Sequence, residues 1–288
     1  MKNDYFQSTE FLEKEKSFLE KHNLVKIIQD EKILIDYVPY ATNDNFCHQK
    51  LYSHPFIYAH RDALENLQKA SKLANEKGFK LRIWDAYRPF EVQAFMADKF
   101  PEHVENGYVS HPSEGVATHV RGIAIDLTLV DKNDEELDMG TSFDDMSEQS
   151  HHGSSEIKEK NKIAEKNRQI LAEIMEKSGF EIYENEWWHY NLKIFKYDGK
   201  GEIIGAESTA DKKYPKIPQG EFLDLLTPEV KKNFFQNFEK FLKEKKFDEK
   251  EKKEISDRFG LIIDNPNSKI QNKETTRLAK LFEKQCQI

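Results

Sequence analysis

The sequence is poor in cysteine and lacks long apolar runs and a net positive charge, and each of these features excludes a class of protein. Its two cysteines, Cys47 and Cys286, stand far apart in the chain, so they form neither a disulfide framework nor a CxxC metal site. No stretch approaches the roughly 20 apolar residues that cross a membrane, so no membrane span is expected. The net charge of −8 argues against a nucleic-acid-binding protein, which needs a basic face to neutralise phosphates.

The N-terminal segment is charged throughout and lacks the apolar run of a signal peptide. We therefore expect a cytoplasmic protein; a periplasmic location would require that Met1 is not the native start. The 288 residues are enough for one large domain, or for one ordinary domain with an appendage.

The spacing of apolar residues predicts an α+β fold. The order of elements lacks the regular alternation of a doubly wound sheet, so we expect a small mixed, largely antiparallel sheet with flanking helices. Helices are predicted over residues 6–24, 62–77, 90–100 and 155–177, and strands over 32–40, 80–84, 123–130, 180–183 and 187–195.

The composition changes after about residue 213. Residues 213–220 resemble a linker, and the Lys/Glu-rich sequence beyond them predicts one helix from Pro228, capped by Thr227, and further helices over 248–260 and 273–284. We therefore divide the chain into a main domain with an N-terminal extension, residues 1–213, and a charged helical C-terminal region, residues 214–288. The C-terminal region contains no catalytic constellation, and we expect it to pack on the main domain or to contact a partner or a second copy.

Two motifs far apart in the sequence indicate a metal site. In the stretch SHPSEGVATHVRGIAIDLT, residues 110–128, His119 stands seven residues before Asp126. Asp126 interrupts an apolar strand, where a carboxylate is costly unless it is paired or bound to a metal. In the second motif, EWWHY, Glu186 stands three residues before His189 among aromatic residues.

Two imidazoles and a carboxylate are a ligand set typical of catalytic zinc, with a fourth position open for water. We therefore expect one Zn²⁺ per chain, bound by His119, Asp126 and His189, in a zinc hydrolase. Glu186 is then free to act as general base on the water. A spacing of three residues does not place Glu186 and His189 on one face of an ideal strand, so a bulge or twist is also expected.

Several motifs occur in the order found in the zinc D-alanyl-D-alanine dipeptidases of the VanX type. They are DAYRP (85–89), ATHVRGIAIDLTL (117–129), MGTSFD (139–144) with the SHH that follows it, and EWWHY (186–190). YATNDNF, near the front, is also similar, and the resemblance covers roughly residues 24–197. It implies a small α+β zinc peptidase fold shared in outline with D,D-carboxypeptidases and the Hedgehog signalling domain.

The same resemblance implies an activity and four roles. The activity is zinc-dependent hydrolysis of a small D,D-dipeptide, D-alanyl-D-alanine, to two D-alanines, as part of cell-wall precursor metabolism or peptidoglycan turnover. His119, Asp126 and His189 match the family's zinc ligands, and Glu186 matches its catalytic base.

Three further residues match family positions around the substrate. Arg88 matches the arginine that stabilises the tetrahedral intermediate, and Asp144 matches the carboxylate placed near the substrate's free amino group. Tyr40 is expected to line the same pocket. The chain departs from the family at Ala117 and Val120, where serines are common, and this leaves the preference between dipeptide and longer stem peptides open.

Two other functions stay open at this point. One is a D,D- or L,D-carboxypeptidase that acts on longer peptidoglycan stem peptides. The other is a non-catalytic zinc-binding module, against which the presence of both Glu186 and Arg88 argues.

Overall fold

The computed structural model describes residues 5–113, 115–194, 196–197, 203–204 and 212–244. Its α-helices are α1 (Thr9–His22), α2 (Arg61–Glu76), α3 (Phe90–Lys99), α4 (Pro101–Glu105), α5 (Ser155–Lys160), α6 (Lys162–Lys177) and α8 (Pro228–Glu244). Its strands are β1 (Leu24–Lys26), β2 (Ile33–Leu34), β3 (Tyr58–His60), β4 (Lys80–Asp85), β5 (Ala124–Val130), β6 (Phe180–Tyr183), β7 (Glu186–Leu192), β8 (Lys196–Tyr197) and β9 (Ile203–Ile204). Short 3-10 helices cover Tyr5–Gln7, Pro39–Ala41, His119–Arg121, Glu148–Ser150 and Leu223–Leu225.

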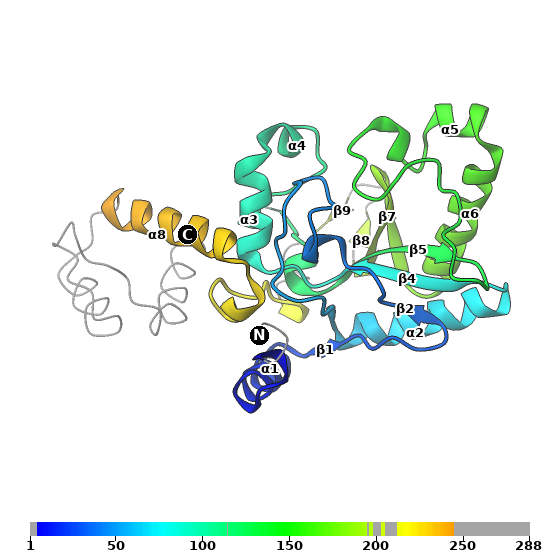
Figure 1. Ribbon diagram of the computed structural model, residues 1–288. Coiled ribbons are helices and arrows are strands. Elements are labelled where there is room, and N and C mark those ends of the chain that lie inside the picture. Colours follow the sequence, from blue (N-terminus) through cyan, green and yellow to red (C-terminus); the bar gives the residue numbers. More distant parts are fainter. Residues whose placement is uncertain (1–4, 114, 195, 198–202, 205–211, 245–288) are drawn as a thin grey trace.

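A five-stranded sheet with the order β2-β4-β5-β7-β6 lies at the centre (Figure 1). The pair β2–β4 is parallel, and the pairs β4–β5, β5–β7 and β6–β7 are antiparallel. The strand pairs β1–β3 and β8–β9 form separate two-stranded sheets. The structure thus confirms the predicted α+β class with a mixed, largely antiparallel sheet.

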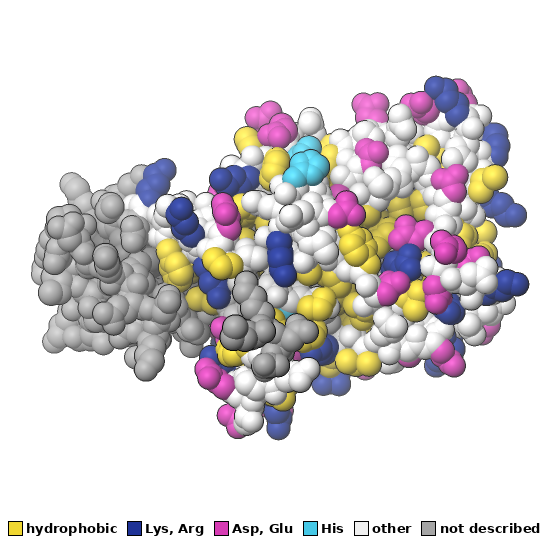
Figure 2. Space-filling model, viewed as in Figure 1, with side chains coloured by type: hydrophobic (Ala, Val, Ile, Leu, Met, Phe, Trp, Pro, Cys, Tyr) yellow, Lys and Arg dark blue, Asp and Glu magenta, His cyan; other side chains and the backbone are white. Residues whose placement is uncertain are grey.

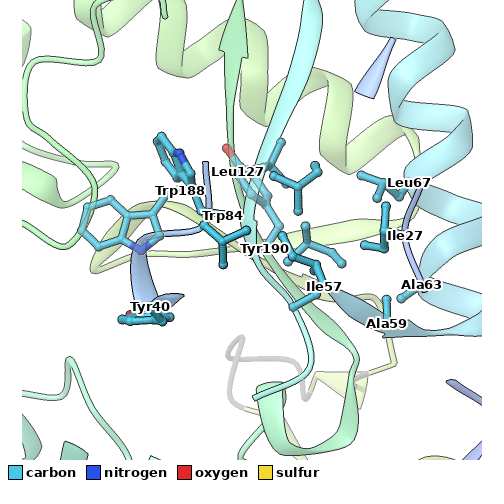
Figure 3. Packing of buried hydrophobic residues seen from close by; sticks show 14 of the residues in the cluster. Ile27, Tyr40, Ile57, Ala59, Ala63, Leu67, Trp84, Leu127, Trp188 and Tyr190 are labelled. Atoms are coloured by element: carbon cyan, nitrogen blue, oxygen red, sulfur yellow. The ribbon is translucent and has the colours of Figure 1, made fainter. Parts of the chain in front are cut away.

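Side chains on β5 alternate between two buried environments, as they must in a strand. Ile125, Leu127 and Leu129 belong to the main hydrophobic core, to which helices α2 and α6 contribute. Figure 3 shows Leu127 within this core, with Leu67 of α2 on one side and Trp84, Trp188 and Tyr40 on the other. Asp126 is equally buried but, by this alternation, points to the opposite face of the sheet. One face of β5 therefore packs in the hydrophobic core, and the other face carries the buried carboxylate of Asp126.

The observed elements differ most from the predicted ones at two places, while the helix predicted over 6–24 is observed at Thr9–His22 and the strand predicted over 187–195 at Glu186–Leu192. The strand expected over residues 32–40 is limited to Ile33–Leu34, and a 3-10 helix begins at Pro39, which has no N–H to donate to a ladder. The helix expected over 155–177 is interrupted at Asn161, whose side-chain oxygen accepts from Ala164 N at 3.0 Å and caps α6. The interruption divides the predicted helix into α5 and α6.

The segment predicted as a linker packs against the main domain. Tyr214 and Ile217 are buried, Arg121 Nη1 donates to Tyr214 O at 2.7 Å, and Ile217 N donates to Val120 O at 3.1 Å. Further along, Thr227 N donates to Leu51 O at 3.1 Å. The residues on either side of residue 213 are therefore joined by tertiary hydrogen bonds, although the composition changes there.

Helix α8 begins at Pro228, directly after Thr227, whose Oγ1 accepts from Val230 N. The start predicted for this helix is thus confirmed. Helix α8 packs beside α3 and projects from the body of the protein (Figure 1). The helices predicted over 248–260 and 273–284 lie outside the described residues.

A second hydrophobic cluster joins α1 to the segment that precedes α8. The rings of Phe11 and Phe222 stack with centroids 5.5 Å apart, and Phe18 packs on both Phe222 and Tyr87. Tyr87 belongs to the DAYRP motif, and its backbone N donates to Tyr58 O at 2.7 Å. The cluster therefore supports the motif from the side opposite the main core.

The surface carries both signs of charge. Figure 2 shows Lys and Arg interspersed with Asp and Glu over the visible face, so no single-sign region gathers there. Among the described residues, no helix is long and apolar enough to cross a membrane.

Gly122 is the residue at which the turn carrying His119 enters β5, and we expect it to tolerate no side chain. Its φ is +68°, and an added Cβ would lie 2.7 Å from Leu24 Cδ2 and 3.0 Å from the backbone N of His60. Gly78 has φ +85° but open space around it. Gly78→Ala should therefore lower the free energy of unfolding by about 1 kcal/mol, from conformation alone. Gly122→Ala should lower it by about 2–3 kcal/mol, because a backbone clash is added. Urea unfolding of both variants tests this, and equal losses would contradict the packing argument.

Candidate active site

All seven residues singled out from the sequence line one cavity of about 250 Å³. They are Tyr40, Arg88, His119, Asp126, Asp144, Glu186 and His189. They come from five separate parts of the chain, and the central sheet brings them together.

Asp126 and His189 meet because β5 and β7 pair. The two residues are direct cross-strand partners in the antiparallel register, and Asp126 Oδ1 lies 3.1 Å from His189 Nδ1. His119 reaches the same point from the 3-10 helix that ends at Gly122, just before β5. Its Nε2 lies 3.2 Å from Asp126 Oδ2.

A bulge in the β6–β7 pair places Glu186 beside His189. Ile182 pairs with Tyr190, but the next residue, Tyr183, pairs with Glu186, so β7 has extra residues between the two pairs. Glu186 Oε2 consequently lies 3.8 Å from His189 Nδ1. The irregularity that the spacing of the EWWHY motif required is confirmed.

The two imidazoles and the carboxylate converge on one point. His119 Nε2 and His189 Nδ1 are 3.1 Å apart, and each lies within 3.2 Å of an Asp126 oxygen. A tetrahedral ion with bonds of 2.0–2.1 Å separates its ligand atoms by about 3.3 Å, close to these distances. The ligand atoms of these three residues lie within 4.8 Å of one another, so the set fits a single metal ion.

The outer nitrogens of both imidazoles have buried acceptors. His119 Nδ1 lies 2.6 Å from Ala86 O, and His189 Nε2 lies 2.9 Å from Asn191 Oδ1. A hydrogen bond at the outer nitrogen keeps the proton there and leaves the inner nitrogen as a free electron pair for a metal. The arrangement therefore fixes His119 to offer Nε2 and His189 to offer Nδ1.

The charges of Asp126 and His189 depend on their neighbours in the site. Burial alone would raise the pKa of Asp126, but the adjacent His119 and His189 hold it well below its usual range. Burial acts to lower the pKa of His189, but Asp126 and Glu186 raise it overall. The two imidazoles therefore favour the charged carboxylate form of Asp126, which lies between them.

Arg88 is buried against the ligand set. Its Nε donates to Asp85 Oδ2 at 2.9 Å, and Nη1 donates to Gln93 Oε1 at 2.9 Å. Its Nη2 lies 3.4 Å from Asp126 Oδ2, at the cavity side. Tyr52 holds Asp85 in turn, through a 2.8 Å bond from its hydroxyl to Asp85 Oδ1. A chain of buried hydrogen bonds thus fixes the plane of the guanidinium.

Asp144 and Tyr40 line another part of the cavity. Tyr40 Oη donates to Asp144 Oδ1 at 3.0 Å, and Phe46 N donates to Asp144 Oδ2 at 3.3 Å. Asp144 has a φ of +60°, a conformation that is uncommon for any residue with a side chain. Burial raises its pKa well above the usual range, although Arg88 acts in the opposite direction.

Glu186 has a different electrostatic setting from Asp126. Burial raises its pKa to about 7, against the lowering effect of His189. Asp126 and Glu186 are therefore held apart in pKa, and such separation is typical of pairs with different roles in acid–base chemistry.

The sequence did not indicate Gln93 and Asn191, which also line the cavity. Asn191 stands two residues after His189, so strand alternation places it on the same face. That spacing is the only signal that could have identified it. Gln93 gave no signal, because its two partners, Arg88 and Ser110, are brought together only by the fold.

Comparison with known proteins gives consistent matches. The model of a family described as D-ala-D-ala dipeptidase matches residues 18–200. A D-alanyl-D-alanine dipeptidase of Escherichia coli is 38% identical over 153 residues, which are 53% of this chain and 76% of the relative. That of Enterococcus faecium is 39% identical over 179 residues, with 55% and 85% covered. That of Enterococcus faecalis is 36% identical over 174 residues, with 53% and 83% covered.

One solved structure, that of the LdcB LD-carboxypeptidase, aligns over 58% of this chain and 70% of its own. The sequence identity is 17% and the TM-score is 0.30. A likeness at this score carries no argument about the chain.

We expect Asn191 to matter for metal affinity. Asn191→Leu removes the acceptor for His189 Nε2 and should weaken metal binding by about 10- to 100-fold, the usual scale for a lost partner of a ligating histidine. Asn191→Asp keeps an acceptor and should retain or tighten binding. Competition against a chromogenic chelator measures both, and a Leu variant that binds metal as tightly as the wild type would refute the role.

Proposed function

The chain belongs to the D-ala-D-ala dipeptidase family of peptidases, and from that premise we propose that it hydrolyses D-alanyl-D-alanine to two D-alanines. The observation that carries the proposal is the single cavity of about 250 Å³ that seven candidate residues line. It is smaller than the roughly 300–1,000 Å³ of pockets that take drug-sized ligands. A substrate of dipeptide size suits such a space.

We propose zinc as the metal, one ion per chain, with His119, Asp126 and His189 as ligands. The donor set, two imidazoles and one carboxylate, is one that catalytic zinc takes in peptidases. When bound, zinc polarises the scissile carbonyl and lowers the pKa of a water molecule towards ~7.

Glu186 is the proposed general base. It lies on the same strand as His189 and adjoins the ligands, so it need not bind the metal itself. With a pKa of about 7, it can take the proton of the attacking water and return it to the leaving amine, because proton transfer is most effective when the pKa lies near the working pH.

Arg88 is the proposed stabiliser of the developing oxyanion. Its guanidinium is charged at every relevant pH, and Nη2 faces the ligand set beside Asp126. A fixed donor at the place where negative charge develops lowers the barrier, since no reorganisation is needed during the reaction.

Asp144, assisted by Tyr40, is proposed to bind the free ammonium of the substrate. Burial keeps the pKa of Asp144 high, and an ammonium beside it would favour the charged carboxylate. Such a pair selects against substrates that are acylated at the N-terminus. This is the feature that would separate a dipeptidase from a carboxypeptidase acting on longer stem peptides.

The proposed division of the chain places all of this chemistry within residues 1–213. Residues 214–288 are proposed as a helical region that stabilises the domain and is available for contact with a partner or a second copy. Its first part supports that role through the hydrogen bonds of Tyr214, Ile217 and Thr227. A cytoplasmic location remains a prediction from the sequence.

Substitutions of Glu186 and of His189 should have different effects on metal content, stability and turnover. His189→Ala should lose metal and activity together, and it should also lose stability because metal binding adds to folding. Glu186→Gln should keep the metal and the melting temperature but lose about 10²–10⁴ in turnover, the usual contribution of a general base. Elemental analysis beside turnover tests both. A Glu186→Gln protein that is metal-free, or that turns over at nearly the normal rate, would show that base and ligands are wrongly assigned.

The rate of hydrolysis should depend on the free ammonium group at the N-terminus of the substrate. Wild-type protein should cleave free D-alanyl-D-alanine at least about one to two decades faster than its N-acetyl form, because a charge-assisted hydrogen bond contributes ~1.5–3 kcal/mol. Asp144→Asn, which keeps the shape, should reduce this ratio towards one. Release of D-alanine from the two substrates measures it. Equal rates in the wild type would favour the carboxypeptidase alternative.

A further inference from the structure

We infer that Gln93 is a positioning residue that aims Arg88 at the reacting carbonyl and ties Arg88 to the rim of the cavity. The inference rests on the proposed function of Arg88. Gln93 lies on α3, five residues after Arg88, and only 5% of it is exposed.

The hydrogen bonds of Arg88 are unequal. Nε and Nη1 each make a 2.9 Å bond, to Asp85 and to Gln93 respectively. Nη2 makes only long contacts, 3.4 Å to Asp126 Oδ2 and 3.5 Å to Tyr40 Oη. A guanidinium is planar, so two short bonds on one side fix the direction of the remaining N–H donors. Those donors, on Nη2, are the ones beside the ligand set.

The amide nitrogen of Gln93 makes a second hydrogen bond, to the backbone at the rim of the cavity. Its Nε2 donates to Ser110 O at 2.8 Å. Ser110, Val116 and Thr118 all line the cavity, and the segment that contains them leads directly to His119. One amide therefore sets the position of the arginine and of the rim segment together.

The amide suits this place better than a carboxylate or an apolar side chain. It offers one acceptor for Arg88 and one donor for the Ser110 carbonyl, so both buried partners are satisfied. Asp85 and Asp126 already lie against the guanidinium. A neutral acceptor adds direction without a third negative charge that would compete with the oxyanion for Arg88.

Gln93→Met keeps the length and bulk of the side chain but removes both hydrogen bonds. We expect kcat for D-alanyl-D-alanine to fall about 10- to 100-fold, the scale of a lost hydrogen bond to a charged group. KM should change less than threefold, because the interaction acts in the transition state. Metal content should be unchanged. Gln93→Glu keeps an acceptor for Arg88 but loses the donor to Ser110 O and adds a negative charge, so its kcat should lie between those of the Met variant and the wild type. Gln169→Met, the same change at an exposed position on α6, serves as the control.

A double-mutant cycle with Arg88→Ala decides whether Gln93 acts through the arginine. The effect of Gln93→Met on kcat should largely disappear in the Arg88→Ala background. An undiminished effect there, or a Met variant with kcat within twofold of the wild type, would overturn the inference. Near-normal kcat in Arg88→Ala alone would instead count against the proposed function.

A spectroscopic readout keeps the inference testable if the protein does not hydrolyse the dipeptide. ¹⁵N NMR of the Arg88 side chain reports rotation of the guanidinium about its Nε–Cζ bond. Rotation should be faster in Gln93→Met than in the wild type and in Gln93→Glu. If the Met variant does not fold, a slow rotation retained in Gln93→Ala would contradict the role, and a fast one would support it.

Discussion

The structure depends on the burial of two imidazoles and a carboxylate that face one another. His119, His189 and Asp126 approach within 3.1–3.2 Å, and such a group is costly in a dry interior unless each member is oriented and paired. Much of the surrounding architecture meets this requirement. The cross-strand pair sets two members, the turn ending at Gly122 brings the third, and the acceptors Ala86 O and Asn191 Oδ1 fix the ring protons.

The sequence predicted the fold class from local patterns, and the seven residues that it singled out line one cavity in the structure. His119, Asp126, Glu186 and His189 were singled out by pattern, whereas Arg88, Asp144 and Tyr40 were singled out by the family resemblance. An Asp within an apolar strand and a Glu-x-x-His within an aromatic run each signal chemistry without knowledge of the fold. Sequence patterns did not identify residues whose partners are distant in the chain and are brought together only by the fold. Gln93 bridges two segments, and nothing in its own surroundings marks it. The packing of residues 213–220 was missed because Pro and Gly suggest a linker, whereas Tyr214 and Ile217 are buried.

Asp126 and Glu186 show how the environment separates the pKa values of two carboxylates in one site. Asp126 lies between two imidazoles and keeps its charge, whereas Glu186, a few ångströms away, has its pKa raised by burial. Arg88 contacts the first and is held at its other nitrogens by Asp85 and Gln93. The different pKa values of the two acids thus follow from the neighbours of each, although both acids stand on adjacent strands of one sheet.

The cluster that joins α1 to the segment before α8 has a consequence for biosynthesis. Phe11 emerges from the ribosome early, but its stacking partner Phe222 follows roughly 200 residues later, on the order of 10–40 s at ~5–20 residues per second. During that interval Phe11 and Phe18 of α1 lack their contact with Phe222, although Phe18 can already pack on Tyr87. This cluster can therefore be completed only after most of the chain has been made.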